Sequence, residues 1–456
     1  MKNQFKVGAA YKIITPPLGT PLYGYAFQRP ATSVADDLRV NAVAVEQGDV
    51  KGIIISADIV SIGYDLVEKI RGLVSKETGV PEMNVSFSAT HTHSGPAIKT
   101  ANGWGTSNTE YIDGILVPQT VLAAKEAVNN LESALMGVGT TNSYVGINRR
   151  EIIQDGSVIL GQNPYGPFDP VMTVVSFASV DGKPLANIVH YGAHGTAAGR
   201  NPEITRDWMG VMVDRLEKET GAMTMFVNGA EGDVGPRLSN GQTTGDTMDW
   251  TKTDIPTGDM KYVYELGSVA AIDAMTAYRN IKEYSEAEFK IGSGTLMLPY
   301  DEQNSYETAK KRFEELDAKD ELIEVENREY AKFGNIVKMY EEGKSFDTQM
   351  EIPQTIFAFN NVAIVPFRFE MFSEIALRLA MYSPYEHTLC LSNTNGSEFY
   401  IPTRSQIVIG GYEIDIFRFG NVYKLVDNVD DIIINENMKI LSRMKPYTIQ
   451  RKERFV

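Results

Sequence analysis

The chain has 456 residues, 43% of them hydrophobic, and this length allows one large domain or two to three ordinary ones. Its formal net charge of −16 disfavours nucleic acids and anionic membrane surfaces as partners, because like charges repel. A single cysteine, Cys390, excludes an internal disulfide framework and is expected to be a small buried residue. Because there is no apolar leader and no apolar run of the roughly 20 residues that cross a bilayer, we expect a cytoplasmic protein without a membrane span.

Apolar segments of strand length alternate with amphipathic helical segments along most of the chain. Continuous apolar runs are typical of strands that are covered on both faces. The predicted strands span residues 52–58, 84–90, 171–178, 186–191, 223–228, 354–366 and 388–393. The predicted helices span residues 66–77, 110–131, 208–219, 260–281, 371–381 and 427–444. This mixture predicts an α/β fold of mixed β-sheets flanked by helices, in a single large domain over residues 1–456.

Two segments interrupt this alternation. The first, within residues 301–345, is highly charged and rich in helix-forming residues, which predicts an inserted pair of exposed helices. A solvated helical hairpin is the plainer role for it, and a rim of the substrate cleft or a contact in a homo-oligomer is the alternative. The second, residues 237–259, is rich in Gly, Thr and Asp and predicts a long surface loop, a kind of segment that is often functional.

Four of the five histidines fall into two clusters, each at the end of a predicted strand. His91 and His93 precede a Ser-Gly-Pro turn, and alternation along a strand would place both side chains on one face. His190 falls within a strand and is the better core candidate, whereas His194 follows Gly192 and is the better metal ligand. Neutral imidazole is a common zinc ligand, and rigid strands can deliver several ligands to a shared rim. A His-x-His pair can also be structural, so both interpretations stay open on spacing alone.

Acidic and aromatic candidates occupy similar places. Asp233 lies in a glycine-rich turn after a predicted strand, and Glu370 stands where a strand leads into a helix. Tyr400 and Tyr412 fall in turns flanked by glycines. Each has a plainer explanation: a tight turn for Asp233, a helix-initiating residue for Glu370 and half-buried packing for the tyrosines. The sequence contains no nucleophile elbow, phosphate-binding loop or dinucleotide fingerprint that would favour another chemistry.

Taken in order, these segments resemble the neutral/alkaline ceramidase family of zinc amidases. The resemblance runs over nearly the whole chain, and the string Ala-Thr-His-Thr-His-Ser-Gly-Pro is its most specific part. The matching segments are Val7-Gly-Ala-Ala10, Ile14-Thr-Pro-Pro-Leu-Gly-Thr20, Ile55-Ser-Ala-Asp58, Ser88-Ala-Thr-His-Thr-His-Ser-Gly-Pro96, Gly146-Ile-Asn-Arg149, the segment around His194, Gly232-Asp233, Glu370, Tyr400-Ile-Pro-Thr403 and Tyr412-Glu413.

The resemblance implies a Zn²⁺ ion and a set of residues around it. The implied zinc ligands are His91, His194, Glu370 and Tyr400. The implied catalytic residues are His93, Arg149 and Tyr412 around the scissile carbonyl, and we group Asp233 of the glycine-rich turn with them. Zinc would lower the pKa of bound water to about 7, cations and donors would stabilise the oxyanion, and His93 could relay a proton.

Two departures from the family pattern bear on the substrate. Gly235 stands where family members that act on ceramide carry a serine, and the chain stops at Val456 without the immunoglobulin-like domain of the long ceramidases. We therefore expect a divergent bacterial-type zinc hydrolase that acts on an amide or ester in a small soluble molecule. The alternatives are another reaction at the same metal site, on a sugar-type or other metabolite, and a non-catalytic protein that binds a metal or ligand.

Overall fold

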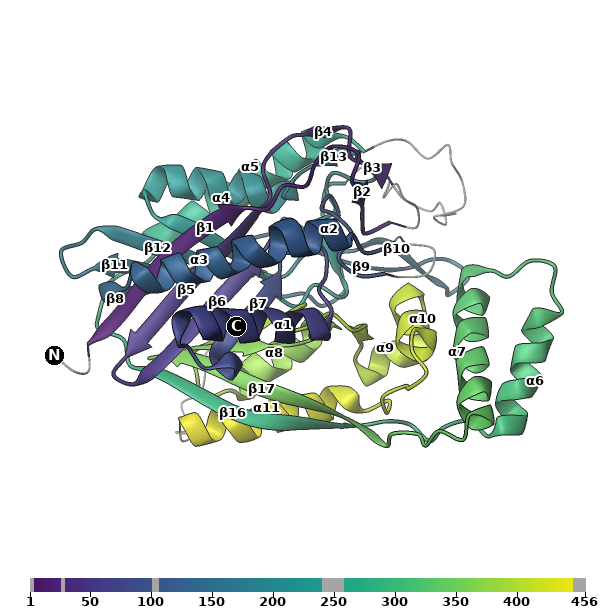
Figure 1. Ribbon diagram of the computed structural model, residues 1–456. Coiled ribbons are helices and arrows are strands. Elements are labelled where there is room, and N and C mark those ends of the chain that lie inside the picture. The colour runs from purple at the N-terminus through teal and green to yellow at the C-terminus, as the bar shows by residue number, and fades with distance from the viewer. Residues whose placement is uncertain (1–3, 26–28, 101–105, 240–257, 446–456) are drawn as a thin grey trace.

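The computed structural model describes residues 4–25, 29–100, 106–239 and 258–445, and two stacked sheets with flanking helices form its centre (Figure 1). The larger sheet is mixed and eight-stranded, in the order β14-β12-β11-β8-β1-β5-β6-β7. The smaller is four-stranded, in the order β16-β17-β18-β20. The predicted fold class, mixed sheets flanked by helices in one large domain, is thus confirmed.

The strands of the larger sheet are β1 Phe5–Ile13, β5 Arg39–Gln47, β6 Val50–Ala57, β7 Val85–Ala89, β8 Glu132–Asn142, β11 Val171–Ser179, β12 Pro184–Tyr191 and β14 Met223–Asn228. Those of the smaller sheet are β16 Phe289–Pro299, β17 Gln349–Phe359, β18 Val362–Pro366 and β20 His387–Leu391. The longer helices are α1 Tyr64–Thr78, α3 Val117–Asn129, α4 Asp207–Thr220, α5 Met260–Arg279, α6 Tyr306–Asp317, α7 Glu324–Glu341, α8 Ser373–Tyr382, α10 Tyr412–Phe419 and α11 Val429–Met444.

Burial on both faces explains the continuous apolar runs of the central strands. In β6, Ile53 and Ile55 pack in the cluster that contains residues of α1 and α3. Ile54, on the opposite face, packs in the cluster that contains Phe357 and Phe359 of the smaller sheet. The smaller sheet in turn buries its other face against α8 and α11. The result is a helix–sheet–sheet–helix stack, held together by apolar surface removed from water.

The larger sheet curls, so that its two edges approach each other. Ser56 Oγ in β6 donates a hydrogen bond to the carbonyl oxygen of Phe226 in β14, at 2.6 Å. Strands β6 and β7 run parallel to each other, as do β12 and β14. The carboxyl ends of β7, β12 and β14 therefore open toward a common region, the position at which α/β sheets usually carry their sites.

Helix α5 lies against β8 at a glycine, Gly139. A Cβ atom on Gly139 would stand 1.9 Å from the carbonyl oxygen of Ala277, so no side chain fits there. We expect Gly139→Ala to lower the free energy of unfolding by about 1–3 kcal/mol, the usual effect of overpacking. Chemical denaturation measures this, with Gly114→Ala as control, since nothing lies within 4 Å of a Cβ at that position. Equal stability of the two variants would contradict this packing.

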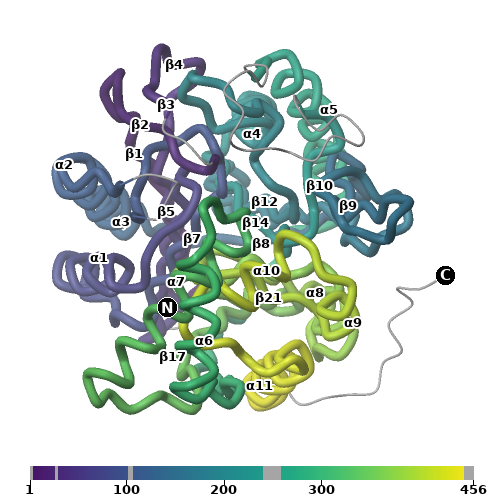
Figure 2. The backbone as a smooth tube through the Cα atoms, turned by 90° about the vertical axis from the view of Figure 1, so that its right-hand side faces the viewer, coloured from purple at the N-terminus to yellow at the C-terminus, as the bar shows by residue number. Residues whose placement is uncertain are grey.

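The charged segment forms α6 and α7. These helices lie in the connection from Pro299, the last residue of β16, to Gln349, the first residue of β17, and these two residues pair with each other. Helix α7 lies beside α10 (Figures 1 and 2). Lys332 Nζ donates to the carbonyl oxygen of Arg418 at 2.7 Å, and the Arg328 guanidinium lies 5.8 Å from the centre of the Tyr412 ring. The inserted helices therefore border the helix on which Tyr412 lies.

Some predicted element boundaries are wrong. The single strand predicted over residues 354–366 is a hairpin of β17 and β18, in which Asn360 adopts a φ of 47° that asparagine tolerates better than most residues. The helix predicted over residues 110–131 begins as a short α2, Thr109–Tyr111, and a π-helical turn, Ile112–Leu116, before α3. Most of the predicted loop at 237–259 lies outside the described residues.

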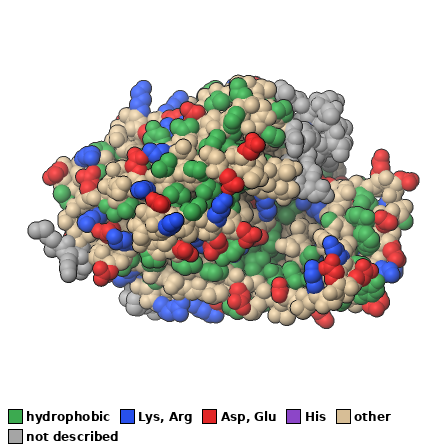
Figure 3. All heavy atoms as spheres, in the orientation of Figure 1, with side chains coloured by type: hydrophobic (Ala, Val, Ile, Leu, Met, Phe, Trp, Pro, Cys, Tyr) green, Lys and Arg blue, Asp and Glu red, His purple; other side chains and the backbone are tan. Residues whose placement is uncertain are grey.

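The surface carries acidic and basic side chains interspersed over the face drawn in Figure 3. Among the described residues, none of the helices combines the length and apolar character needed to cross a membrane.

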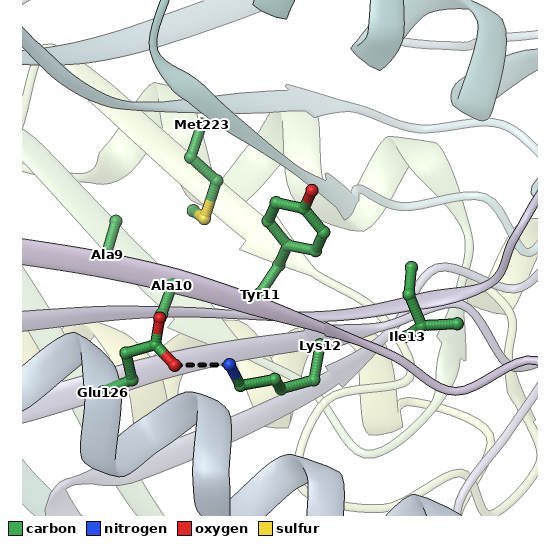
Figure 4. Close-up of a pocket in the computed structure, with 7 residues that line it drawn as sticks. All are labelled: Ala9, Ala10, Tyr11, Lys12, Ile13, Glu126 and Met223. Atoms are coloured by element: carbon green, nitrogen blue, oxygen red, sulfur yellow. Dashed lines mark hydrogen bonds and ion pairs between the residues drawn. The ribbon is translucent and has the colours of Figure 1, made fainter.

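A shallow depression lies along β1, which pairs with β8 through only two residue pairs. It is lined by Ala9–Ile13, Glu126 and Met223, and an ion pair joins Lys12 to Glu126 (Figure 4). None of these residues is among the site candidates.

Candidate metal centre

His91 lies just beyond the end of β7, in a backbone conformation that few non-glycine residues adopt. Its φ is 67°, in the left-handed region, and such positions concentrate at functional sites. Strand alternation therefore does not orient the two histidines as predicted. The turn brings them together instead, with His91 Nε2 3.2 Å from His93 Nε2.

The rings of His91 and His194 are held by carbonyl oxygens. His91 Nδ1 contacts the carbonyl oxygen of Val60 at 2.6 Å. His194 Nδ1 contacts the carbonyl oxygens of Glu231 and Val234 at 3.0 and 3.1 Å. A carbonyl oxygen only accepts hydrogen bonds, so each Nδ1 carries the proton, and each Nε2 lone pair is left for a ligand. Outer contacts of this kind are usual for metal-binding histidines.

Glu370 completes a triangle with these two nitrogens. It lies in the short strand β19, Glu370–Met371, directly before α8. Glu370 Oε2 lies 3.5 Å from His91 Nε2 and 3.3 Å from His194 Nε2. Neither contact has the geometry of a hydrogen bond, so Oε2 is a buried acceptor without a donor among the described residues.

Two sides of this triangle have the spacing expected around a zinc-sized cation. With metal–ligand bonds of about 2.0–2.1 Å and tetrahedral angles, neighbouring ligand atoms stand about 3.3–3.4 Å apart. The two distances from Glu370 Oε2, 3.5 and 3.3 Å, match that spacing. A cation would also satisfy the otherwise unpartnered oxygen, whose burial is unfavourable without a partner.

Tyr400 and Arg149 line the same centre. Tyr400 lies in β21, Tyr400–Ile401, which pairs in parallel with β19 so that Tyr400 is in register with Glu370. Arg149 lies in β9, Gly146–Ile152, and its Nη2 donates to Tyr400 Oη at 3.1 Å. Its Nη1 lies 2.9 Å from His194 Nε2. A metal ion at His194 needs the same lone pair, so Arg149 Nη1 must release it when the centre is loaded.

Burial and the neighbouring charges favour the ionised form of Glu370 and the neutral form of His93. Burial alone would raise the pKa of Glu370, but the His91 charge and the contact with His194 hold it well below its usual range. Burial and the neighbouring His91 and His194 hold the pKa of His93 well below the ordinary value. His93 is partly exposed as a residue, yet its Nδ1 is buried and without a hydrogen-bond partner in the described part of the chain.

The wall beside His93 comes from the segment after β2, Pro21–Leu22. A Cβ on Gly24, whose φ is 111°, would lie 2.6 Å from the His93 ring, so only glycine allows this approach. The rings of Tyr25 and His93 are 5.2 Å apart, edge to face. Arg29, which is 7% exposed, donates through Nη2 to the carbonyl oxygen of His93 at 2.6 Å. These contacts fix His93 within the site.

The structure brings Tyr412 to this region and directs Asp233 elsewhere. Tyr412 begins α10 rather than lying in a turn, and its ring centre is 6.1 Å from that of Tyr400. Asp233 Oδ1 accepts from Ser373 N at 2.7 Å, and its Oδ2 accepts from Asn148 Nδ2 at 3.1 Å. Asp233 thus ties the glycine-rich turn to the start of α8 and does not face the histidines.

Comparison with known proteins gives this arrangement a family. The pattern described as neutral/alkaline non-lysosomal ceramidase, N-terminal, matches residues 5–295, which is more than half of the chain. The chain belongs to the neutral/alkaline ceramidase family. Family membership implies an amide hydrolase. The sequence matches no curated protein.

Solved structures of ceramidases share the fold. Neutral ceramidase from Pseudomonas aeruginosa is 16% identical, with a TM-score of 0.70 over 97% of this chain and 75% of that chain. A ceramidase complexed with C2 is 15% identical, with a TM-score of 0.71 over 98% of this chain and 76% of that chain. At this identity the likeness concerns the fold. The family match itself ends before Glu370, Tyr400 and Tyr412, so their roles depend on the geometry described above.

The candidate site also contains two buried acidic residues for which the sequence predicted no role. Glu231, two residues from Asp233, is 0% exposed, and its Oε1 accepts a hydrogen bond from Asn393 Nδ2 at 2.6 Å. Glu413, also 0% exposed, pairs with Arg149 at 2.8 Å and with Arg150 at 2.5 Å. The glycine-rich turn was a visible signal for Glu231, but spacing alone did not distinguish it from Asp233.

Proposed function

We propose that this chain is a zinc-dependent hydrolase that cleaves an amide bond, or an ester, in a small soluble substrate. The observation that carries the proposal is the unpartnered Oε2 of Glu370, which faces the Nε2 atoms of His91 and His194 at 3.5 and 3.3 Å. Membership of the ceramidase family supports the choice of an amide. Gly235 pairs with Ile147 through the backbone and offers no side-chain donor, which supports a substrate other than ceramide.

In this proposal, His91, His194, Glu370 and Tyr400 hold the zinc ion. When bound, zinc polarises a carbonyl oxygen as a Lewis acid and lowers the pKa of water toward neutrality. Burial and the nearby Glu370 raise the pKa of Tyr400 well above its ordinary value, although Arg149 opposes them. A bound cation reverses that balance, because it favours the ionised phenol.

Arg149 and Tyr412 are the donors to the developing oxyanion. The Arg149 guanidinium is fixed in advance, because Glu413 accepts from its Nε at 2.8 Å and the side chain is 7% exposed. A donor that is already oriented needs no reorganisation when negative charge forms on the carbonyl oxygen. Helix α10 carries both Tyr412 and Glu413, so one element positions the tyrosine and the partner of the arginine.

His93 moves the proton. Its depressed pKa keeps the imidazole neutral and able to accept. As the new C–O bond forms, His93 takes a proton from the attacking water. As the C–N bond breaks, it returns that proton to the leaving nitrogen, so that a carboxylic acid and an amine are released.

Replacement of His93 by glutamine tests this role. We expect kcat to fall by about 10²–10⁴-fold, the usual contribution of a positioned acid–base group. Zinc affinity should stay close to that of the native chain, because the four proposed ligands are unchanged. Steady-state kinetics and a zinc competition assay measure the two effects. Loss of zinc binding in this variant would make His93 a ligand and contradict the role given to it.

The reaction class is tested with panels of probes. The metal-free chain and the chain loaded with one equivalent of Zn²⁺ are incubated with N-acyl amides, esters and glycosides of small size. We expect zinc-dependent release of an amine from the amides, detected with an amine-reactive dye. Zinc-dependent cleavage confined to the glycosides would overturn the proposal.

A further inference from the structure

A second buried carboxylate lies against the proposed metal centre. Glu231 is 0% exposed, and its Oε2 has no hydrogen-bond partner among the described residues. One ligand atom each of His91, Glu231 and Glu370 lies within 4.8 Å of the others. Glu231 and Glu370 thus lie close together, each with a buried unpartnered oxygen, and two negative charges at this range would repel.

The surroundings of Glu231 hold it in this position. The carboxylate is anchored at Oε1 by Asn393 Nδ2, at 2.6 Å, and the same nitrogen lies 3.3 Å from His91 Nδ1. The carbonyl oxygen of Glu231 accepts from His194 Nδ1 at 3.0 Å. Glu231 therefore contacts His194 through its backbone, and its carboxylate is held by the Asn393 side chain, which lies beside the His91 ring. A carboxylate with no role in the centre would more readily be replaced by a neutral side chain, because burial of an unpaired charge is unfavourable.

The second carboxylate changes the charge balance around the proposed metal centre. Arg149 and Arg150 share the single carboxylate of Glu413, which leaves one positive charge over, and Glu370 offsets it. Without Glu231, these four side chains would offer a divalent cation no net negative charge. With Glu231 ionised, a second negative charge faces the cation, and Coulomb attraction at this range and burial is strong.

We propose that Glu231 is a further carboxylate of the metal centre, whose unpartnered oxygen supplies the negative charge that a divalent cation needs there. This inference rests on the proposed function, since it assumes a cation at His91, His194 and Glu370. It differs from a structural role in one respect: Glu231 should stabilise the loaded chain and destabilise the metal-free one.

The experiment compares Glu231→Gln with the native chain and with Asp207→Asn. Asp207 is an equally buried acid, 0% exposed, but its Oδ1 accepts from the backbone N–H groups of Ala197 and Trp208 and its Oδ2 from that of Ala198. The zinc dissociation constant is measured by competition with a chromogenic chelator, and the thermal midpoint is measured without metal. Neither readout depends on catalysis.

We expect Glu231→Gln to weaken zinc binding by about 10–100-fold, as for conserved partners of metal ligands. Its metal-free midpoint should equal or exceed that of the native chain, because a neutral amide replaces a buried carboxyl group that has an unpartnered oxygen beside Glu370. Asp207→Asn should show the reverse: a lower metal-free midpoint and zinc affinity within a few-fold of native. Glu231→Leu serves as a second variant without the charge and should behave like Glu231→Gln in both measurements.

Any one of three results would overturn this inference and leave the proposed function standing. They are unchanged zinc affinity in both Glu231 variants, zinc binding weakened equally in Asp207→Asn, or failure of both Glu231 variants to fold without metal. The last would show that the metal-free fold itself needs the carboxylate. Failure of the native chain to bind zinc is a different outcome, because it would overturn the proposed function together with this inference.

Discussion

Replacement of His194 by alanine is expected to abolish tight zinc binding and, with it, zinc-dependent activity. His194 is 1% exposed, its Nδ1 is fixed by two carbonyl oxygens, and its Nε2 lies 3.3 Å from Glu370 Oε2. Removing a direct ligand should weaken binding by more than the roughly 10–100-fold typical of outer partners. Zinc competition and metal analysis of the purified protein measure the loss.

His190 provides the matched control for that experiment. It lies on β12, the strand that leads to His194, and is 7% exposed, but its Nε2 contacts the carbonyl oxygen of Cys390 at 3.0 Å, in the core. We expect His190→Ala to lower stability and to leave zinc affinity unchanged. Equal zinc affinity in the native chain and His194→Ala would contradict the proposed ligand set.

Replacement of Arg149 by glutamine is expected to separate catalysis from metal binding. The rate should fall by about 10²–10³-fold, as when a single oxyanion donor is removed. Zinc affinity should stay equal or increase, because Arg149 Nη1 occupies the lone pair of His194 at 2.9 Å and brings a positive charge to the centre. Stability should fall by about 3 kcal/mol, since Glu413 is 0% exposed and loses one of its two partners.

Arg150→Gln is the control for Arg149, because it disturbs the same carboxylate from the other side. Arg150 Nη1 donates to Glu413 Oε2 at 2.5 Å, and its Nε donates to Gln406 at 3.0 Å. Within the described part of the chain, none of its hydrogen bonds goes to a histidine. We expect a similar loss of stability on chemical denaturation and a much smaller loss of rate. A fall in rate as large as in Arg149→Gln would assign the effect to Glu413 and not to an oxyanion donor.

The fold class could be predicted because its strands are buried on both faces. The run of apolar residues in β6 and the amphipathic period of α4 and α11 are visible without coordinates. Other strands are weak in sequence for physical reasons. Strand β8 contains Gly137 and Gly139, which lower strand propensity. Their role is visible only in the fold, where α5 packs on Gly139 and the segment after α5 packs on Gly137. The order of strands depends on long-range pairing that local patterns do not encode.

The candidate site was predictable in composition but not in geometry. Histidines at two strand ends and the resemblance to a family gave the proposed ligands, which the fold brings together. The left-handed turn at His91, with a φ of 67°, replaces the strand alternation expected for His91 and His93. Glu231 and Asp233 stand two residues apart in one turn, and only the fold places Glu231 close to His91 and Glu370 while Asp233 accepts from the first N–H group of α8.

The most direct test of the proposed zinc site is anomalous diffraction at the zinc absorption edge from crystals of the zinc-loaded chain. The account predicts one strong anomalous peak per chain, in contact with His91 Nε2, His194 Nε2 and a carboxylate oxygen of Glu370. A peak elsewhere, or no peak at these three residues after loading, would contradict the claim that this site is a metal centre.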